Sequence, residues 1–207
     1  MVLTKIREMV IEGEGEEAVA LIKQAMQANI SVRDIVSEGL IGAMNVVGPK
    51  MASGEMFVPE VLMCAEAMQE GLVYLKPFLK DGDVVSSGKF LIGTVKGDLH
   101  DIGKNLVAMM MESSGFEVFN IGIDQSTEAF LEAIEQHKPD IVGLSALLTT
   151  TMPAMRDTVN DIREKGIAVK IFVGGAPVSE EFAKEIGADA YCPDAAETVV
   201  LAKAMLA

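Results

Sequence analysis

Apolar residues recur every three or four positions from residue 3 to about residue 79. This spacing places them on one face of a helix, where they are buried against a neighbouring helix. The clearest stripe consists of Val32, Ile35, Val36, Leu40, Met44, Val47 and Met51. Breaks in the pattern fall at Gly13 and Gly15, at Asn29 and Ser31, and at Ser53 and Gly54. The pattern predicts four helices that form a bundle over residues 1–80, with Ser31 as an N-cap.

The pattern changes after a polar, Gly- and Ser-containing segment at 81–89, which is the predicted domain linker. Short β-branched or apolar runs then alternate with helical stretches. The predicted strands are 90–95, 116–122, 140–148, 169–173 and 190–193. Strands that alternate with helices indicate right-handed βαβ units and a parallel sheet. The expected fold class is therefore α/β, with a flavodoxin-like or Rossmann-like five-stranded domain over 90–207 behind a helical domain.

Composition excludes several classes of partner. The 207 residues include 17 basic and 31 acidic ones, which gives a formal net charge of −14 at pH 7. Such a charge repels phosphate backbones and anionic lipid surfaces, so neither nucleic acid nor membrane is an expected partner. The longest apolar runs fall far short of the roughly 20 residues that span a bilayer. Because acidic residues interrupt the first apolar run, no signal peptide is expected, and we predict a cytoplasmic protein.

Polar and small residues gather at the predicted strand ends. In a parallel sheet, ligands bind outside the carboxyl ends of the strands, where the strand order reverses. The first strand is followed by the loop of Asp98 and His100, the third ends at Ser145 ahead of hydroxyl residues 149–151, and the fourth ends at Gly174. With the flavodoxin-like order 2-1-3-4-5, the loops after strands one and three face each other across the crevice.

His100 is a candidate metal ligand that stands alone. The other histidine, His137, lies in a predicted helix and cannot join it. A protein zinc site needs three or four side chains, whereas a single imidazole suffices when a macrocycle supplies four equatorial nitrogens. Asp98 stands two residues before His100, so in an extended loop both side chains point the same way. The carboxylate can then accept the other imidazole N–H and fix the tautomer.

Three motif elements occur with a defined spacing. They are Asp98, His100 and Gly103, then 41 residues, Ser145 and Leu147, then 26 residues, and Gly174 and Gly175. In these elements the chain resembles cobalamin-binding domains of the base-off, His-on type, as found in methionine synthase and in corrinoid proteins of methyltransferase systems. The resemblance covers the whole chain, because those proteins carry a four-helix cap ahead of the cobalamin domain. Residues 56–62 resemble the cap segment that lies over the corrin.

The resemblance implies roles for individual residues. His100 would replace the cofactor's dimethylbenzimidazole as the lower axial ligand of cobalt, with Asp98 as its hydrogen-bonding partner. Thr151 matches a serine of the best-known ligand triad; it keeps the hydroxyl and adds a methyl group. The remaining cofactor-binding residues implied are Leu99, Asp101, Ile102, Gly103, Ser145, Leu147, Thr149, Gly174, Gly175, Asp194 and Ala195.

The function that the resemblance implies is that of a methyl carrier. Cobalamin would cycle between cob(I)alamin and methylcobalamin as a substrate-specific methyltransferase delivers a methyl group and a second methyltransferase, acting on tetrahydrofolate or a thiol, removes it. A reductive activator is a further implied partner. The sequence shows no nucleophile–base pair, zinc set or paired carboxylates, so no catalytic residue is predicted. Substrate activation would then belong to the partner enzymes.

Two alternatives come from other functional classes. A cobalamin-dependent isomerase subunit would share the ligand loop, but the helical cap is not expected there. A cobalamin-sensing regulator would need a basic helix that contacts DNA, which the acidic N-terminal bundle does not supply. A flavodoxin-like or receiver-like domain without cobalamin is the fallback, although a receiver would need an aspartate where Ser145 ends the third strand.

Overall fold

The computed structural model of the protein describes residues 2–78 and 86–206. The chain forms two compact units, Met1–Ser86 with Ser113–Gly115, and Ser87–Glu112 with Phe116–Ala207. The predicted linker at 81–89 falls largely on residues 79–85, which lie outside the described residues. The domain boundaries drawn from the sequence therefore stay predictions.

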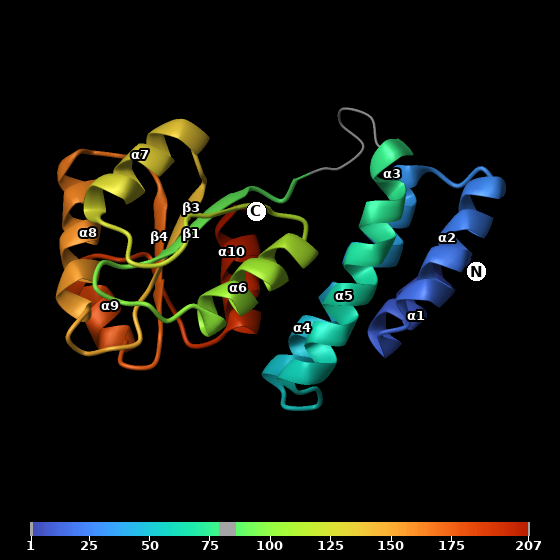
Figure 1. Ribbon diagram of the computed structural model, residues 1–207, viewed down its shortest axis with the longest axis horizontal. Coiled ribbons are helices and arrows are strands. Elements are labelled where there is room, and N and C mark those ends of the chain that lie inside the picture. Colours follow the sequence, from blue (N-terminus) through green and yellow to red (C-terminus); the bar gives the residue numbers. More distant parts are fainter. Residues whose placement is uncertain (1, 79–85, 207) are drawn as a thin grey trace. The chain divides into compact units, whose positions relative to one another are not determined.

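The N-terminal unit is helical, as predicted (Figure 1). It consists of α1 (Val2–Glu12), α2 (Gly15–Gln27), α3 (Val32–Asp34), the π-helix η1 (Ile35–Ile41), α4 (Gly42–Ala52), α5 (Val58–Leu75) and the 3-10 turn η2 (Lys76–Phe78). The segments α3, η1 and α4 follow one another without a break, so they correspond to the third of the four predicted helices. Ser31 caps this helix by accepting a hydrogen bond of 3.0 Å from the Asp34 N–H.

The π-helix was not predicted. Arg7 on α1 donates hydrogen bonds of 3.1 and 2.9 Å from its guanidinium to the carbonyl of Glu38. A π-turn shifts the backbone bonding by one residue, and the Glu38 carbonyl that Arg7 contacts lies within it. Gly39 and Gly42 lie at the same place and leave room for the side chains of Ile6 and Arg7. The helix pattern in the sequence does not reveal this local change of period.

The C-terminal unit is built on a five-stranded parallel sheet. Its strands are β1 (Lys89–Thr94), β2 (Glu117–Asn120), β3 (Ile141–Ser145), β4 (Lys170–Gly174) and β5 (Ala190–Cys192). The order is β2-β1-β3-β4-β5, and every neighbouring pair is parallel. The predicted fold class is confirmed, and the strand order is the flavodoxin-like one. Strands β2, β3 and β5 are shorter than the apolar runs that predicted them, whereas β1 and β4 have the predicted length.

Helices cover both faces of this sheet (Figure 1). They are α6 (Ile102–Ser113), α7 (Thr127–His137), α8 (Met152–Glu164), α9 (Glu180–Ile186) and α10 (Ala195–Leu206). Burial on two sides explains why the strands are apolar throughout rather than alternating. For example, Leu91 belongs to the core cluster beneath α7, α8 and α9 together with Phe130 and Val159. Among the described helices, none is long and apolar enough to span a membrane.

Gly175 is required where β3 and β4 end. Its φ is +124°, and a Cβ added there would lie 1.9 Å from the carbonyl oxygen of Ala146. The two strand ends also share a hydrogen bond of 3.2 Å from the Ala146 N–H to the Gly174 carbonyl. A side chain at position 175 would break this contact. The protein's own backbone therefore gives one reason for the Gly-Gly motif that does not involve a ligand.

We expect Gly175→Ala to destabilise the protein without any cofactor by about 2 kcal/mol or more, because of the overlap with Ala146 and the positive φ. Urea unfolding measures this. Gly103→Ala is the control, since nothing lies within 4 Å of a Cβ at that helical position. This variant should be as stable as the wild type or slightly more stable. Equal stability of the two variants would contradict the prediction.

Candidate functional site

The candidate site lies at the carboxyl ends of β1 and β3. These strands are neighbours with Thr94 opposite Ser145, so the loops that follow them start side by side. The N–H of Val95 continues the pairing with a 3.0 Å hydrogen bond to the Ser145 carbonyl. The sequence predicted that these two loops face each other, and the structure confirms this placement.

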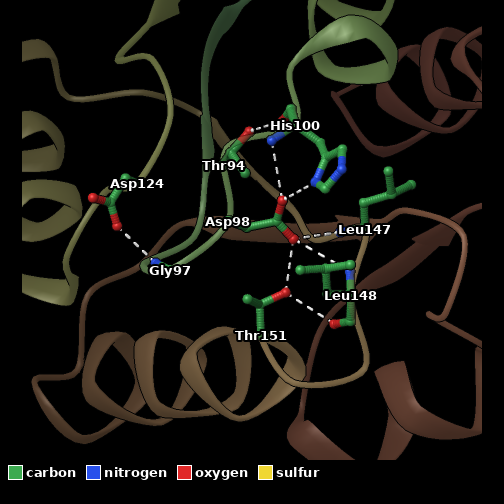
Figure 2. Close-up of polar contacts among 8 residues, drawn as sticks. All are labelled: Thr94, Gly97, Asp98, His100, Asp124, Leu147, Leu148 and Thr151. Carbon is green, nitrogen blue, oxygen red and sulfur yellow. Dashed lines mark hydrogen bonds and ion pairs between the residues drawn. The ribbon is translucent and has the colours of Figure 1, made fainter.

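The Asp98 carboxylate joins the two loops (Figure 2). It is fully buried. Its Oδ1 accepts a hydrogen bond of 3.1 Å from the backbone N–H of His100 and lies 2.7 Å from His100 Nδ1. Its Oδ2 accepts bonds of 2.7 and 3.3 Å from the N–H groups of Leu147 and Leu148, and one of 2.7 Å from Thr151 Oγ1. Both oxygens of the buried group are thereby satisfied.

These hydrogen bonds determine the charge of Asp98. Burial by itself raises the pKa of a carboxyl group, because it penalises the charged form. The donors from Thr151, Leu147 and His100 outweigh burial and hold the pKa of Asp98 well below its ordinary value. The group is therefore an anion at neutral pH.

His100 is held by one ring nitrogen, and within residues 2–78 and 86–206 nothing hydrogen-bonds the other. A carboxylate only accepts hydrogen bonds, so the proton of the neutral ring belongs on Nδ1, and the lone pair belongs on Nε2. Nε2 lies on the side of the ring away from Asp98 (Figure 2). The side chain is 50% exposed. The backbone is fixed as well, because buried Thr94 donates a 2.9 Å bond from Oγ1 to the His100 carbonyl.

Large aliphatic side chains of the two loops that follow β1 and β3 are exposed in the structure. Leu99 is 67% exposed and Ile102 is 86% exposed, while Leu147 and Leu148 are each more than two-fifths exposed. Exposed apolar side chains next to a single polar ligand suit a flat, largely apolar molecule. Among the described residues no group of three or more His, Cys, Asp and Glu side chains is arranged to hold a metal ion. The donor set thus fits a metal whose other ligands come with a macrocycle.

The remaining predicted residues occupy the same edge of the sheet. Ser145 lies opposite Gly174 in the sheet register, and Thr149 is exposed in the loop after β3. Asp101 accepts a 3.1 Å bond from the Asn105 side chain, next to Gly103 in the first turn of α6. Asp194 and Ala195 stand at the start of α10, two strands away from β3, where Asp194 accepts a bond from the Glu197 N–H. The direct network contains Asp98, His100, Leu147 and Thr151; the others lie around it.

Sequence comparison places this geometry in a known family. B12 binding domains match the chain over residues 88–202 and, in a second match, over residues 2–76. The chain belongs to the B12-binding corrinoid proteins of methyltransferase systems. This corrinoid protein is 39% identical to dimethylamine corrinoid protein 1 of Methanosarcina acetivorans, over 99% of this chain and 97% of that one. It is 36% identical to the trimethylamine corrinoid protein of Methanosarcina barkeri, over 99% and 96% of the chains.

Solved structures agree with the sequence relatives. One chain of the methanol:cobalamin methyltransferase complex from Methanosarcina barkeri superimposes with a TM-score of 0.90 at 30% identity, covering 99% of this corrinoid protein and 79% of that chain. A cobalamin-binding protein from Desulfitobacterium hafniense gives a TM-score of 0.81 at 31% identity, covering 98% and 97%. The predicted cofactor, cobalamin with its cobalt, is confirmed for the family, and the fold assignment is confirmed with it.

We expect Asp98→Asn to lower the stability of the corrinoid protein without cofactor by about 2–4 kcal/mol at pH 7, because an amide N–H₂ would face donors. The pKa of Asp98 is depressed by folding, so its contribution is present above the unfolded-state pKa of about 4 and is lost as pH falls further. The difference between wild type and variant should therefore shrink below about pH 4.

Urea unfolding at several pH values measures this difference. Asp157→Asn, at an exposed position of α8, is the matched control and should follow the wild type throughout. A stability difference for Asp98→Asn that stays constant down to pH 3 would show that the carboxylate charge is not its source.

Proposed function

We propose that this corrinoid protein carries a methyl group on cobalamin that is bound with His100 as the lower axial ligand. One observation carries the proposal: a buried, ionised carboxylate holds Nδ1 of the half-exposed imidazole at 2.7 Å, and no described residue hydrogen-bonds Nε2. A carboxylate on the far nitrogen fixes the tautomer of a metal-binding histidine and raises its basicity. Bound cobalamin would supply the cobalt centre that accepts and gives up the methyl group.

The chain's own residues would orient the ligand and exclude water. Asp98 holds the Nδ1 proton, and Thr151 holds Asp98 by a 2.7 Å bond. Thr151 Oγ1 also lies 2.9 Å from the Leu148 carbonyl, so its one proton has two acceptors in reach. The aliphatic side chains of Leu99, Ile102 and Leu147 would lie against the corrin and keep water from the axial bond. Ser145, Gly174 and Gly175 would line the path of the displaced nucleotide tail.

The partners are proposed from the relatives. Several are named for dimethylamine or trimethylamine, and one structural relative is part of a methanol:cobalamin methyltransferase complex. A substrate-specific methyltransferase would deliver the methyl group here, and a second methyltransferase would pass it to tetrahydrofolate or a thiol. A reductive activator would reduce cobalt that has become oxidised. Methylated amines head the proposed donors, because relatives named for them are 33–44% identical and the methanol relative is 30% identical.

The ligand assignment predicts a specific spectroscopic result. The protein is loaded with hydroxocobalamin, desalted, and reduced to cob(II)alamin for EPR. A coordinating ¹⁴N splits each cobalt line into three and a ¹⁵N splits it into two. Each cobalt line should be split into three in protein with natural isotopes. It should be split into two in protein grown on ¹⁵N-histidine and loaded with unlabelled cobalamin, because the ligand would come from His100.

The chain supplies a matched control, since it contains two histidines. His137 ends α7 and stacks on Phe119, with ring centroids 4.1 Å apart. His137→Gln should keep the isotope effect, and His100→Ala should abolish it. Three lines from the ¹⁵N-histidine protein would mean that the cofactor's own base is the ligand. No retained corrinoid would sink the proposal as a whole.

Methyl transfer is tested with protein that carries reduced cobalamin. A methyltransferase specific for dimethylamine or trimethylamine is added with each amine and with methanol. We expect the absorbance of the methylated corrinoid to appear with one amine and not with methanol. Methylation by methanol alone, with its own methyltransferase, would reject methylated amines as the donor class.

A further inference from the structure

Lys104 is a buried cation that the site described so far does not use. It lies in the first turn of α6 and is 3% exposed. Burial and the positive end of the helix dipole both disfavour a cation there. Burial lowers the pKa of Lys104, and the charge of nearby Asp101 opposes this shift. A charge kept in such a place despite these costs indicates a specific role.

The Lys104 ammonium binds two amide oxygens. Its Nζ donates bonds of 2.6 Å to Asn105 Oδ1 and 2.8 Å to Asn120 Oδ1. Among the residues that the structure describes, no carboxylate lies within ion-pair distance of it. Because an ammonium only donates, both amides must present their oxygens to it. The Asn120 N–H₂ group then donates a 3.1 Å bond to Asn105 Oδ1. The Asn105 N–H₂ group donates a 3.1 Å bond to Asp101 Oδ2.

This cluster ties the start of α6 to the end of β2. Asn120 is the last residue of β2, and its Oδ1 also accepts a 3.1 Å bond from the Gly122 N–H. The carbonyl of Gly122 in turn accepts a 2.9 Å bond from the N–H of Thr94. The loop of residues 120–125, called here the β2 loop, is thus fixed at its first half.

The second half of the β2 loop forms hydrogen bonds with the loop that carries His100. Asp124 Oδ1 accepts a 2.7 Å bond from the Gly97 N–H (Figure 2), and the Asp124 N–H donates a 3.0 Å bond to the Asp98 carbonyl. Gln125 extends the contact by a 2.9 Å bond to the Thr94 carbonyl. Asp124 adopts a φ of +53°, which aspartate and asparagine tolerate better than other non-glycine residues. Hydrogen bonds from the β2 loop therefore fix the position of the backbone at Asp98.

We propose that Asp124 is a positioning residue for the axial histidine, acting through Gly97 and Asp98, and that Lys104 keeps the β2 loop in place for it. The inference rests on the proposed role of His100. Asp98 binds the imidazole ring, and Asp124 determines where the Asp98 backbone lies. The β2 loop therefore braces the ligand loop from the side opposite to the β3 loop.

The test uses the protein with and without cobalamin. In the cofactor-free protein, two-bond ¹H–¹⁵N correlations report which ring nitrogen carries the proton, and His137 serves as an internal reference. Wild type should show His100 protonated on Nδ1. In Asp124→Ala, the ratio of the Nδ1-protonated to the Nε2-protonated tautomer of His100 should fall about two- to tenfold, as expected for the loss of one hydrogen bond. Asp124→Asn keeps the acceptor and should restore it.

In the loaded protein, EPR measures the fraction of cob(II)alamin that carries the histidine. Asp124→Ala should retain corrinoid, while the ratio of histidine-ligated to other cob(II)alamin falls about two- to tenfold. Lys104→Met should act in the same direction. Asp157→Ala and Lys165→Met remove charges of the same sign at exposed positions and should behave like wild type.

A wild-type tautomer of His100 in Asp124→Ala overturns the proposal, whatever the loaded protein does. Should Lys104→Met not fold, the Asp124 variants still decide the matter, because their side chain is exposed and outside the core. Wild-type protein without a histidine signature in EPR refutes the proposed function instead. The tautomer measurement on cofactor-free protein keeps these two failures apart.

Discussion

The arrangement of the candidate site depends on one buried anion. The Asp98 carboxylate collects donors from its own loop and from backbone groups 49 and 50 residues further along the chain. A buried charge is costly unless every lone pair finds a donor, so these partners stabilise the site as a set rather than singly. The carboxylate positions the imidazole, and it also holds the turn after β3 through the N–H groups of Leu147 and Leu148. The same group thus links the ligand-bearing loop to the sheet.

The sheet supplies the geometry that the carboxylate needs. Parallel pairing puts Thr94, Ser145 and Gly174 side by side at the ends of three successive strands. A shift of register by one residue would turn each of these positions to the opposite face. Because these strands are buried on both faces, their apolar pattern alone does not specify the register, and contacts at the strand ends must do so. Gly175 adds a local restriction, since the backbones of β3 and β4 approach there more closely than any side chain allows.

Much of this could be predicted from the sequence. The strands and the pairing of Asp98 with His100 follow from local patterns: apolar runs, Gly-rich strand ends and a two-residue spacing. The strand order follows only if the flavodoxin-like fold class is assumed. Thr94, Gly97, Asp124 and the Lys104 cluster were missed, because their hydrogen bonds join loops whose meeting depends on the three-dimensional register. The β2 loop also lies outside the crevice between β1 and β3, where the strand order predicts the ligand. The π-helix was missed because apolar spacing varies too little over one turn to reveal it. The one available signal for the cluster was a lysine in the first turn of a helix, where an acidic residue is usual.

Thr151 has a consequence for how the site responds to change. Its hydroxyl oxygen is within bonding distance of both Asp98 Oδ2 and the Leu148 carbonyl, at 2.7 and 2.9 Å. Rotation about one C–O bond moves the proton from one acceptor to the other while every heavy atom stays in place. With the proton turned to the Leu148 carbonyl, Asp98 Oδ2 would keep only its two backbone donors, the N–H groups of Leu147 and Leu148. Two hydrogen-bonding states of the buried carboxylate are thus related by a single torsion angle, with both loops in the same place.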